Sequence, residues 1–438
     1  MSDARTRMND ALAGTPLASR IEHAAALLLE RHPNEITALA EETLRGVARA
    51  VAAHPDTGVF LGHRPTLLAK IETAAGSGLE ARAAALADWR VEDPEDLEAA
   101  LDALRVLRRE ETCIAACLQY AGLADFSEVS DFLSILAETI TRRSLDLASR
   151  AARGQPFHFA VVGMGKIAGR EFTYHSDLDL IFLTDGGPED VHLASRIGQR
   201  LISYLTTMTG AGVAYAVDTR LRPSGGQGML VTTLAGFERY QCEQAQTWEH
   251  IAMLRARPIA GDEHDARETL ERVRARVLEG HAPPWPELVA IRRRVEEERT
   301  AGDDGEIPFK TGSGGLMDVD FLAGGGLLET HPAALPEHPS VPEMLRAAAA
   351  GPGVEQLLED YALLRRVEAA ARWCAGRPVE GVPARGEELA VVAELTGSDG
   401  DHALAASLAS ARERVRAAYD AVIAAGSISA LAESQPRG

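Results

Sequence analysis

Two aspartates one residue apart, Asp177 and Asp179, follow a glycine-rich turn and carry the clearest chemical signal in the sequence. The apolar run Phe159–Val162 leads into Gly163 and Gly165, and the two acids stand at the start of the next apolar run. Residues two apart in a strand point to the same face, so their carboxylates are predicted to converge. Converging carboxylates beside exposed backbone N–H groups suit a Mg²⁺–nucleotide complex.

A third acid, Asp218, ends the stretch Gly212–Asp218, which alternates enough to predict another strand. Two magnesium ions bridged by three carboxylates can align an attacking oxygen, an α-phosphate and a leaving pyrophosphate. Neutralising the charge that builds on the leaving group is the main task in such transfers. The order of strand, Gly–Lys turn, Asp-x-Asp strand and later single Asp resembles the site of the nucleotidyltransferase superfamily related to DNA polymerase beta.

The lysines add a second signal, because only three of the 45 basic residues are lysines. Lys166 lies in the first glycine-rich segment and Lys310 in a second one, Lys310–Gly315. A compact ammonium in a glycine-rich loop, where arginine is otherwise the rule, indicates a charge that faces phosphate. Coincidence is the simpler alternative.

Two arginines after the third acid are further candidates for binding the phosphates of the nucleotide. Arg220 and Arg222 follow Asp218 at strand spacing, which predicts that they share its face and clamp phosphate oxygens. The alternative is a salt bridge to the acids themselves. The residues predicted to hold the nucleotide are Gly163, Gly165, Lys166, Ser176, Arg220, Arg222 and Lys310.

The spacing of the glycines and the acids excludes two other kinds of nucleotide-binding site. A dinucleotide-binding fold needs a crossover helix between its glycines and an acid about twenty positions on. Asp177 and Asp179 come 12 and 14 positions after Gly165, too few for a strand, a helix and a second strand. The sequence also lacks the Gly-x4-Gly-Lys-Ser/Thr pattern of a P-loop.

Composition bounds the class of protein. The chain has 438 residues, 46% of them hydrophobic, and a formal net charge of −20, which is typical of a globular protein with several domains. Nucleic-acid binders present basic surfaces, so this acidic balance argues against one. No apolar segment predicts a signal peptide or a membrane span. Four scattered cysteines suit a reducing compartment, and we expect a cytoplasmic protein.

The patterning divides the chain into five segments. Residues 1–15 are expected to be disordered, and residues 16–153 to form a helical domain, because apolar residues recur there at spacings of three and four. Residues 154–262 mix short apolar runs with helical stretches and hold the acids. Helical periodicity returns over 263–432, and 433–438 are expected to form a frayed tail. The predicted fold class is α+β and mostly helical, with a small mixed sheet between helical domains.

Four stretches resemble, in the correct order, the signatures of the glutamine synthetase adenylyltransferases. These stretches are Gly163–Phe182, Val217–Val231, Tyr240–Arg257 and Lys310–Phe321. The resemblance implies a polymerase-beta-like catalytic domain and an enzyme that moves AMP from ATP to a tyrosine hydroxyl of glutamine synthetase. Full-length members carry one module that adds AMP and one that removes it by phosphorolysis. This chain resembles a single module of the adding kind, with a PII-type nitrogen signalling protein as a possible further partner.

The resemblance assigns Asp177, Asp179 and Asp218 as catalytic and metal-binding residues. Three features depart from the family pattern: Asp320 replaces a Glu, Ala168 replaces a Gly, and Gly324–Gly326 are expected to interrupt a helix that is normally continuous. Three alternatives stay open. They are removal of AMP by phosphorolysis, transfer to another protein, and a non-catalytic regulator that binds glutamine synthetase.

Overall fold

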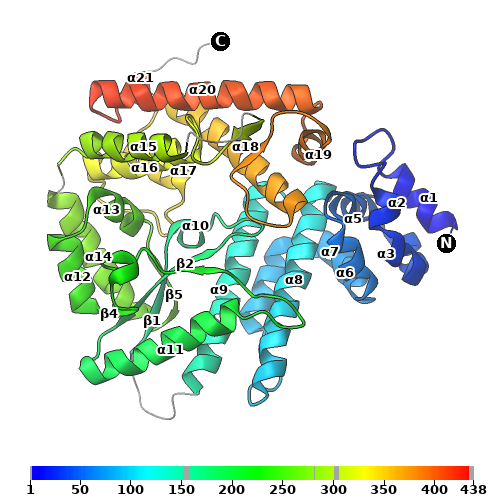
Figure 1. Ribbon diagram of the computed structural model, residues 1–438, viewed down its shortest axis with the longest axis horizontal. Helices are drawn as coiled ribbons and strands as arrows, with labels where there is room; N and C mark the ends of the chain where they lie inside the picture. Colours follow the sequence, from blue (N-terminus) through cyan, green and yellow to red (C-terminus); the bar gives the residue numbers. More distant parts are fainter. Residues whose placement is uncertain (1, 151–157, 281, 300–304, 434–438) are drawn as a thin grey trace.

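The strands of the central sheet divide their side chains between two hydrophobic cores. A computed structural model describes residues 2–150, 158–280, 282–299 and 305–433 (Figure 1). In β2 (Leu178–Thr184), the even-numbered apolar side chains face one core, and Ile181 and Leu183 face the other. Neighbouring side chains of a strand point to opposite sides, so a strand covered on both faces must be apolar throughout.

The sheet has five strands and mixed direction. Its other strands are β1 (Ala160–Gly163), β3 (Val217–Asp218), β4 (Val231–Thr233) and β5 (Arg257–Gly261). The strand order is β3–β2–β1–β5, and β4 also pairs with β2. Strand β1 is antiparallel to both β2 and β5, whereas β3 and β4 run parallel to β2.

Helices form the N-terminal part. They are α1 (Ser2–Asp10), α2 (Ile21–Ala24), α3 (Ala26–Arg31), α4 (Pro33–Ala38), α5 (Glu41–Ala53), α6 (Asp56–Gly62), α7 (Leu67–Asp88), α8 (Leu97–Ala121) and α9 (Phe126–Arg150). Local sequence sets the limits of α8: the Asp96 side chain accepts a hydrogen bond from the Ala99 N–H, and Gly122 ends the helix in a left-handed conformation.

The expectation of a disordered N-terminus at 1–15 is wrong for the described residues. Helix α1 occupies most of this segment, and Ala4, Met8 and Leu12 are completely buried. Their spacing of four residues places them on one side of a helix, which gives the short polar segment an apolar stripe to bury. Of the predicted tail 433–438, only Glu433 lies within the described residues, at the end of α21.

The middle and C-terminal parts carry the remaining elements. Around the sheet these are α10 (Gly165–Ala168), α11 (Pro188–Thr206), the 3₁₀ turn η1 (Gly225–Gln227), α12 (Leu234–Glu243), α13 (Thr247–Leu254) and α14 (Glu263–Gly280). Beyond it are α15 (Trp285–Arg299), β6 (Glu306–Pro308), α16 (Leu316–Thr330), α17 (Val341–Ala348), α18 (Pro352–Ala375), β7 (Gly381–Pro383), α19 (Glu387–Thr396), α20 (Asp401–Ala425) and α21 (Ala430–Glu433). The predicted α+β fold, mostly helical with a small mixed sheet, is confirmed.

Helix α16 runs unbroken through Gly324–Gly326, so the expected interruption is wrong. All three glycines are buried. A Cβ atom at Gly325 would lie 2.7 Å from Cζ3 of Trp285 and 2.9 Å from Cδ1 of Leu288. The glycines therefore let neighbouring helices approach α16 closely, and that packing offsets their low helix propensity.

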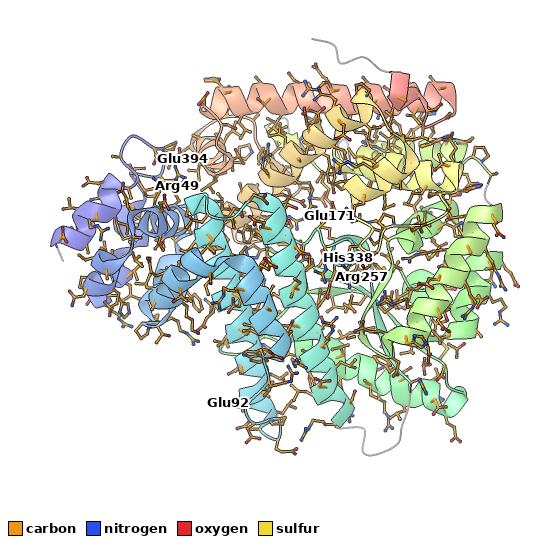
Figure 2. All side chains as sticks on the ribbon, turned by 180° about the vertical axis from the view of Figure 1, so that it is seen from behind. Arg49, Glu92, Glu171, Arg257, His338 and Glu394 are labelled. Atoms are coloured by element: carbon orange, nitrogen blue, oxygen red, sulfur yellow. The ribbon has the colours of Figure 1, made fainter. Side chains whose placement is uncertain are left out.

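The two faces of the sheet are covered by different parts of the chain (Figure 1). Helices α9 and α11 contribute to one core, and α14 with the C-terminal helices contributes to the other. The N-terminal helices also contact the C-terminal part directly: Arg49 of α5 lies 2.8 Å from Glu394 of α19 (Figure 2). None of the helices in the described ranges combines the length and apolarity that crossing a membrane requires.

Candidate active site

Asp177 immediately precedes β2, Asp179 belongs to β2 and Asp218 belongs to β3, and the three acids meet at one end of the sheet. The parallel register sets Asp179 directly beside Asp218. One carboxylate oxygen from each of Asp177, Asp179 and Asp218 lies within 4.8 Å of the other two. These three residues are called the acid trio below. Leu178 and Leu180 pack into the core behind them, because their side chains leave the opposite face of β2.

Gly165 allows the glycine-rich turn to pass against Asp179. Its φ of +53° is a left-handed conformation, and a Cβ atom there would lie 2.9 Å from Oδ2 of Asp179. The backbone N–H of Met164 donates a hydrogen bond of 2.9 Å to the Asp179 carbonyl oxygen. Residue 165 must therefore be glycine both for its backbone conformation and for its distance from the acid.

The acids of the trio differ in their electrostatics. Burial, and after it the charges of Asp177 and Asp218, raise the pKa of Asp179 to about 7. A hydrogen bond from Arg220 lowers the pKa of Asp218 below its usual range. The trio thus concentrates negative charge that the protein compensates at Asp218 and leaves largely uncompensated at Asp179.

This donor set fits a divalent cation that prefers oxygen ligands. Three carboxylates converge from two adjacent strands and the residue before one of them, and Asp177 is exposed while the other two are half-buried. A hard cation such as Mg²⁺ takes one or two carboxylates, keeps several waters and binds phosphate oxygens in its remaining positions. Asp177, Asp179 and Asp218 are the residues that would hold it.

Lys166 does not present a free ammonium group to solvent. Its Nζ contacts the Glu368 carboxylate of α18. Glu368 also lies 3.0 Å from Arg365 and 3.0 Å from Arg372. Burial, together with the two arginines, lowers the pKa of Lys166 to about 7, although Glu368 opposes that shift. Lys166 therefore joins the glycine-rich turn to the C-terminal helices.

Glu368 is the site residue that sequence reasoning missed. It is fully buried, 202 positions from Lys166. One local signal was available, because Glu368 stands three residues after Arg365 and four before Arg372 in a helical, alanine-rich stretch. That spacing places all three on one face of a helix, and an acid between two arginines on a face that is otherwise apolar indicates a buried charge cluster.

The two predicted arginines behave differently. Arg220 forms hydrogen bonds through Nε to both carboxylate oxygens of Asp218, at 3.0 and 2.8 Å. Arg222 instead donates to the carbonyl oxygens of Thr219, Gly226 and Gly228 and so closes the loop before β4. Arg220 thus makes the salt bridge considered as an alternative, and Arg222 holds a turn.

Ser176 and Lys310 also have partners within the protein. The Ser176 hydroxyl is buried, accepts a hydrogen bond from the Thr173 N–H at 3.2 Å and lies 3.4 Å from Arg372. Lys310 lies 3.0 Å from Glu380. The positive charge of Lys310, after that of Lys166, nevertheless opposes the rise that burial causes in the pKa of Asp179, so this lysine lies within electrostatic range of the acid trio.

A second buried cluster lies next to the glycine-rich turn, around Glu171 (Figure 2). The Glu171 carboxylate contacts Arg255 and accepts a hydrogen bond of 2.7 Å from the Tyr361 hydroxyl. Arg365 donates to the Glu171 carbonyl oxygen. Asp320, the residue that departs from the family pattern, lies 3.5 Å from Arg255 at the edge of this cluster.

A small mixed sheet that bears three converging acids beside a glycine-rich turn places the protein in the α+β class that includes nucleotidyltransferases. A family model described as glutamate-ammonia ligase adenylyltransferase matches residues 44–272, which is more than half of the chain. The chain belongs to this family.

Curated relatives share the name bifunctional glutamine synthetase adenylyltransferase/adenylyl-removing enzyme. The protein of Chromobacterium violaceum is 34% identical over 357 residues, which cover 76% of this chain and 39% of the relative. That of Thioalkalivibrio sulfidiphilus is 37% identical over 255 residues, covering 52% and 26%. That of Pseudomonas syringae pv. tomato is 36% identical over 342 residues, covering 67% and 34%. The chain thus spans about two fifths or less of these relatives.

Proposed function

We propose that this protein transfers AMP from ATP to a tyrosine hydroxyl of glutamine synthetase and thereby regulates nitrogen assimilation in the cytoplasm. The acid trio is the observation that carries the proposal, because its three carboxylates converge at one end of the paired strands β2 and β3, beside a glycine-rich turn. Family membership and the names of the relatives support the same reaction class and the same protein substrate.

In this proposal the hydroxyl oxygen bonds to the α-phosphorus, the bond to the pyrophosphate oxygen breaks, and the hydroxyl proton leaves to a base. Bound Mg²⁺ would neutralise charge on the phosphates and the leaving group. Asp177, Asp179 and Asp218 hold the cation, and Asp218 also assists removal of the proton. Lys310 and Arg220 supply positive charge to phosphate oxygens.

The experiment is transfer of label from α-labelled ATP to purified glutamine synthetase in the presence of Mg²⁺. The variant Asp177→Asn/Asp179→Asn is expected to lose at least about 100-fold in rate, since removing one group that stabilises transition-state charge already costs about that much. Asp399→Asn is the matched control, because Asp399 is exposed and lies in the turn between α19 and α20. Equal rates in all three proteins would remove the acid trio from the proposal.

The reverse direction needs its own assay. Glutamine synthetase that already carries AMP is incubated with the protein and inorganic phosphate, and release of ADP is measured. ADP without forward transfer would assign phosphorolytic removal instead. Mg–ATP binding without either reaction would favour another acceptor or a need for an effector, which addition of a PII-type protein tests. A protein that does not bind Mg–ATP would fit a non-catalytic regulator.

A further inference from the structure

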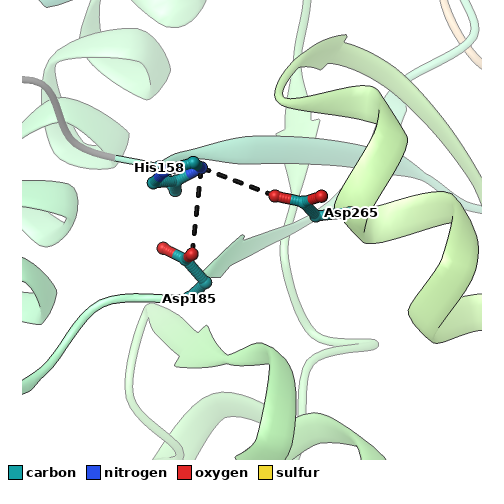
Figure 3. A group of neighbouring side chains, drawn as sticks. All are labelled: His158, Asp185 and Asp265. Atoms are coloured by element: carbon teal, nitrogen blue, oxygen red, sulfur yellow. Dashed lines mark ion pairs between the residues drawn. The ribbon is translucent and has the colours of Figure 1, made fainter.

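A second group of side chains that could ligate a metal is formed by His158, Asp185 and Asp265 (Figure 3). It lies at the end of the sheet opposite the acid trio. His158 precedes β1, Asp185 follows β2, Asp262 follows β5, and Asp265 belongs to the first turn of α14. Because β1 is antiparallel to β2 and β5, the start of β1 lies beside the ends of β2 and β5, and these four residues are close together. The seven residues of β2 separate this group from the trio by about 20 Å.

The distances within the group are those of ligands around an ion. Nδ1 of His158 lies 3.5 Å from Oδ2 of Asp265, and 3.9 Å from an oxygen of Asp185 and of Asp262. Hydrogen bonds to nitrogen measure about 2.7–3.2 Å, so these separations are too long for direct hydrogen bonds. Two ligands each about 2.1 Å from a tetrahedral ion lie about 3.4 Å apart.

A small hollow lies beside the group, whose side chains are partly exposed. It measures about 10 Å³ and is lined by His158 and the three aspartates together with apolar residues that include Leu183, Leu234 and Ala266. This volume is close to that needed to hold one water-sized species. The hollow leaves room beside the ligands, and the ligand spacing is the observation that indicates an ion.

The three carboxylates of the group give it a negative charge that favours binding of a cation. In the ranges that the structure describes, Asp185, Asp262 and Asp265 form ion pairs with His158 and with no lysine or arginine. Asp262 is partly satisfied, because it accepts a hydrogen bond of 2.6 Å from the Phe159 N–H. Three carboxylates that share one imidazole carry excess negative charge, which a divalent cation would balance.

We propose that His158, Asp185 and Asp265 bind a first-row transition-metal ion such as Zn²⁺, with Asp262 oriented beside it by the Phe159 N–H. An imidazole nitrogen among the ligands selects such an ion over Mg²⁺, which prefers oxygen ligands. The ion joins the start of β1, the end of β2 and the start of α14, which are otherwise held together here by strand pairing and core contacts. Its role is structural, because the acid trio lies at the other end of the sheet.

Calorimetric titration of Zn²⁺ into the metal-stripped, tag-free full chain tests the proposal. The background is Asp177→Asn/Asp179→Asn, so that the acid trio does not contribute. One equivalent is expected to bind this background and to raise its melting temperature. Adding His158→Ala is expected to weaken binding by about tenfold or more. His264→Ala is the matched control, because His264 is an exposed histidine on α14 outside the group.

A second ligand variant guards against a folding defect in the first. Asp185→Asn, checked by circular dichroism, is expected to weaken Zn²⁺ binding as His158→Ala does. The proposal is overturned if the background binds no Zn²⁺, if both ligand variants bind it as the background does, or if His264→Ala weakens binding equally.

Discussion

Asp179 and Asp218 lie directly opposite each other across the parallel pair of β2 and β3. Because side chains alternate between faces, a shift of one residue in this register would turn Asp218 away from Asp179. Buried Arg105 holds the loop that precedes β3, donating to the carbonyl oxygens of Gly212 at 2.9 Å and Thr207 at 2.6 Å. The meeting of the two acids thus depends on a guanidinium group in the N-terminal helices.

Replacing Gly165 by alanine is expected to harm both stability and activity. The left-handed backbone costs a residue with a Cβ about 1–2 kcal/mol, and the methyl group would push against Asp179. Because a displacement of about 1 Å costs about 100-fold in rate, we expect a loss of AMP transfer of that order. Urea unfolding and the labelled-ATP assay measure the two effects. Gly210→Ala, where a Cβ meets no atom of the described residues within 4 Å, should leave both unchanged.

Arg220→Ala separates the two roles considered for this arginine. A charge-assisted hydrogen bond contributes about 1.5–3 kcal/mol, so loss of a phosphate clamp is expected to raise the KM for Mg–ATP about tenfold or more. A salt bridge that only restrains Asp218 would leave this KM unchanged. Steady-state kinetics decide between these outcomes, with exposed Arg239→Ala as the control.

Glu368→Gln is expected to destabilise the protein strongly. The change keeps the shape but leaves Lys166, Arg365 and Arg372 without their shared buried carboxylate. Removing one partner from a buried ion cluster costs about 3–5 kcal/mol, which urea denaturation can measure. Glu355 on the same helix pairs with exposed Arg346, so Glu355→Gln should change the free energy of unfolding by less than about 0.5 kcal/mol. Similar changes in the free energy of unfolding in both variants would contradict a stabilising role for the buried Glu368 carboxylate.

The same carboxylate predicts a dependence of stability on pH. Burial alone would raise the pKa of Glu368, but Lys166, Arg365 and Arg372 hold it at about 2, below the usual value of about 4.3. The unfolded chain therefore binds the proton first, and the stabilisation is complete above about pH 4.3 and is lost as pH falls toward 2. The difference in unfolding free energy between the wild type and Glu368→Gln should shrink over that window. A constant difference would show that Glu368 keeps an ordinary pKa.

Gly325→Ala in α16 is expected to lower stability, although alanine favours helices. The added methyl group would overlap the Trp285 ring, which a 2.8 Å hydrogen bond to Glu329 holds in place. Overpacking costs about 1–3 kcal/mol, against a gain of up to about 1 kcal/mol in helix propensity. Gly76→Ala in α7 has open space and should stabilise the protein instead. Thermal unfolding of the two variants compares them directly.

Sequence patterns predict the parts of the fold that residues close together in the chain determine. The apolar runs at β1 and β2, and the limits of α8 and α18, follow from periodicity and from glycines at helix ends. The stretch Phe237–Arg257, which has helical periodicity, divides into α12 and α13 before β5 begins at Arg257. Strand β5 is short and contains a proline, and its strand conformation comes from pairing with β1, which the local sequence does not reveal.

In the candidate site, too, the sequence predicts the local features but not the contacts between distant parts of the chain. The convergence of Asp177 and Asp179 follows from a spacing of two, so the sequence predicts it. The partner of Lys166 lies on a helix 202 residues away, and no local pattern connects the two. Phosphate contacts were predicted for Lys166 and Ser176 from their place in the chain alone, whereas their buried partners depend on how α18 packs against the turn.

The contact between Lys166 and Glu368 has a consequence for dissecting the protein into fragments. A recombinant fragment that ends after β5 would retain the whole acid trio, yet Lys166 would lose its counter-ion and Glu171 its bond from Tyr361. The apolar face formed by Ile181 and Leu183 would also meet water. Such a fragment is expected to aggregate, so the smallest autonomous unit that retains this site includes α18.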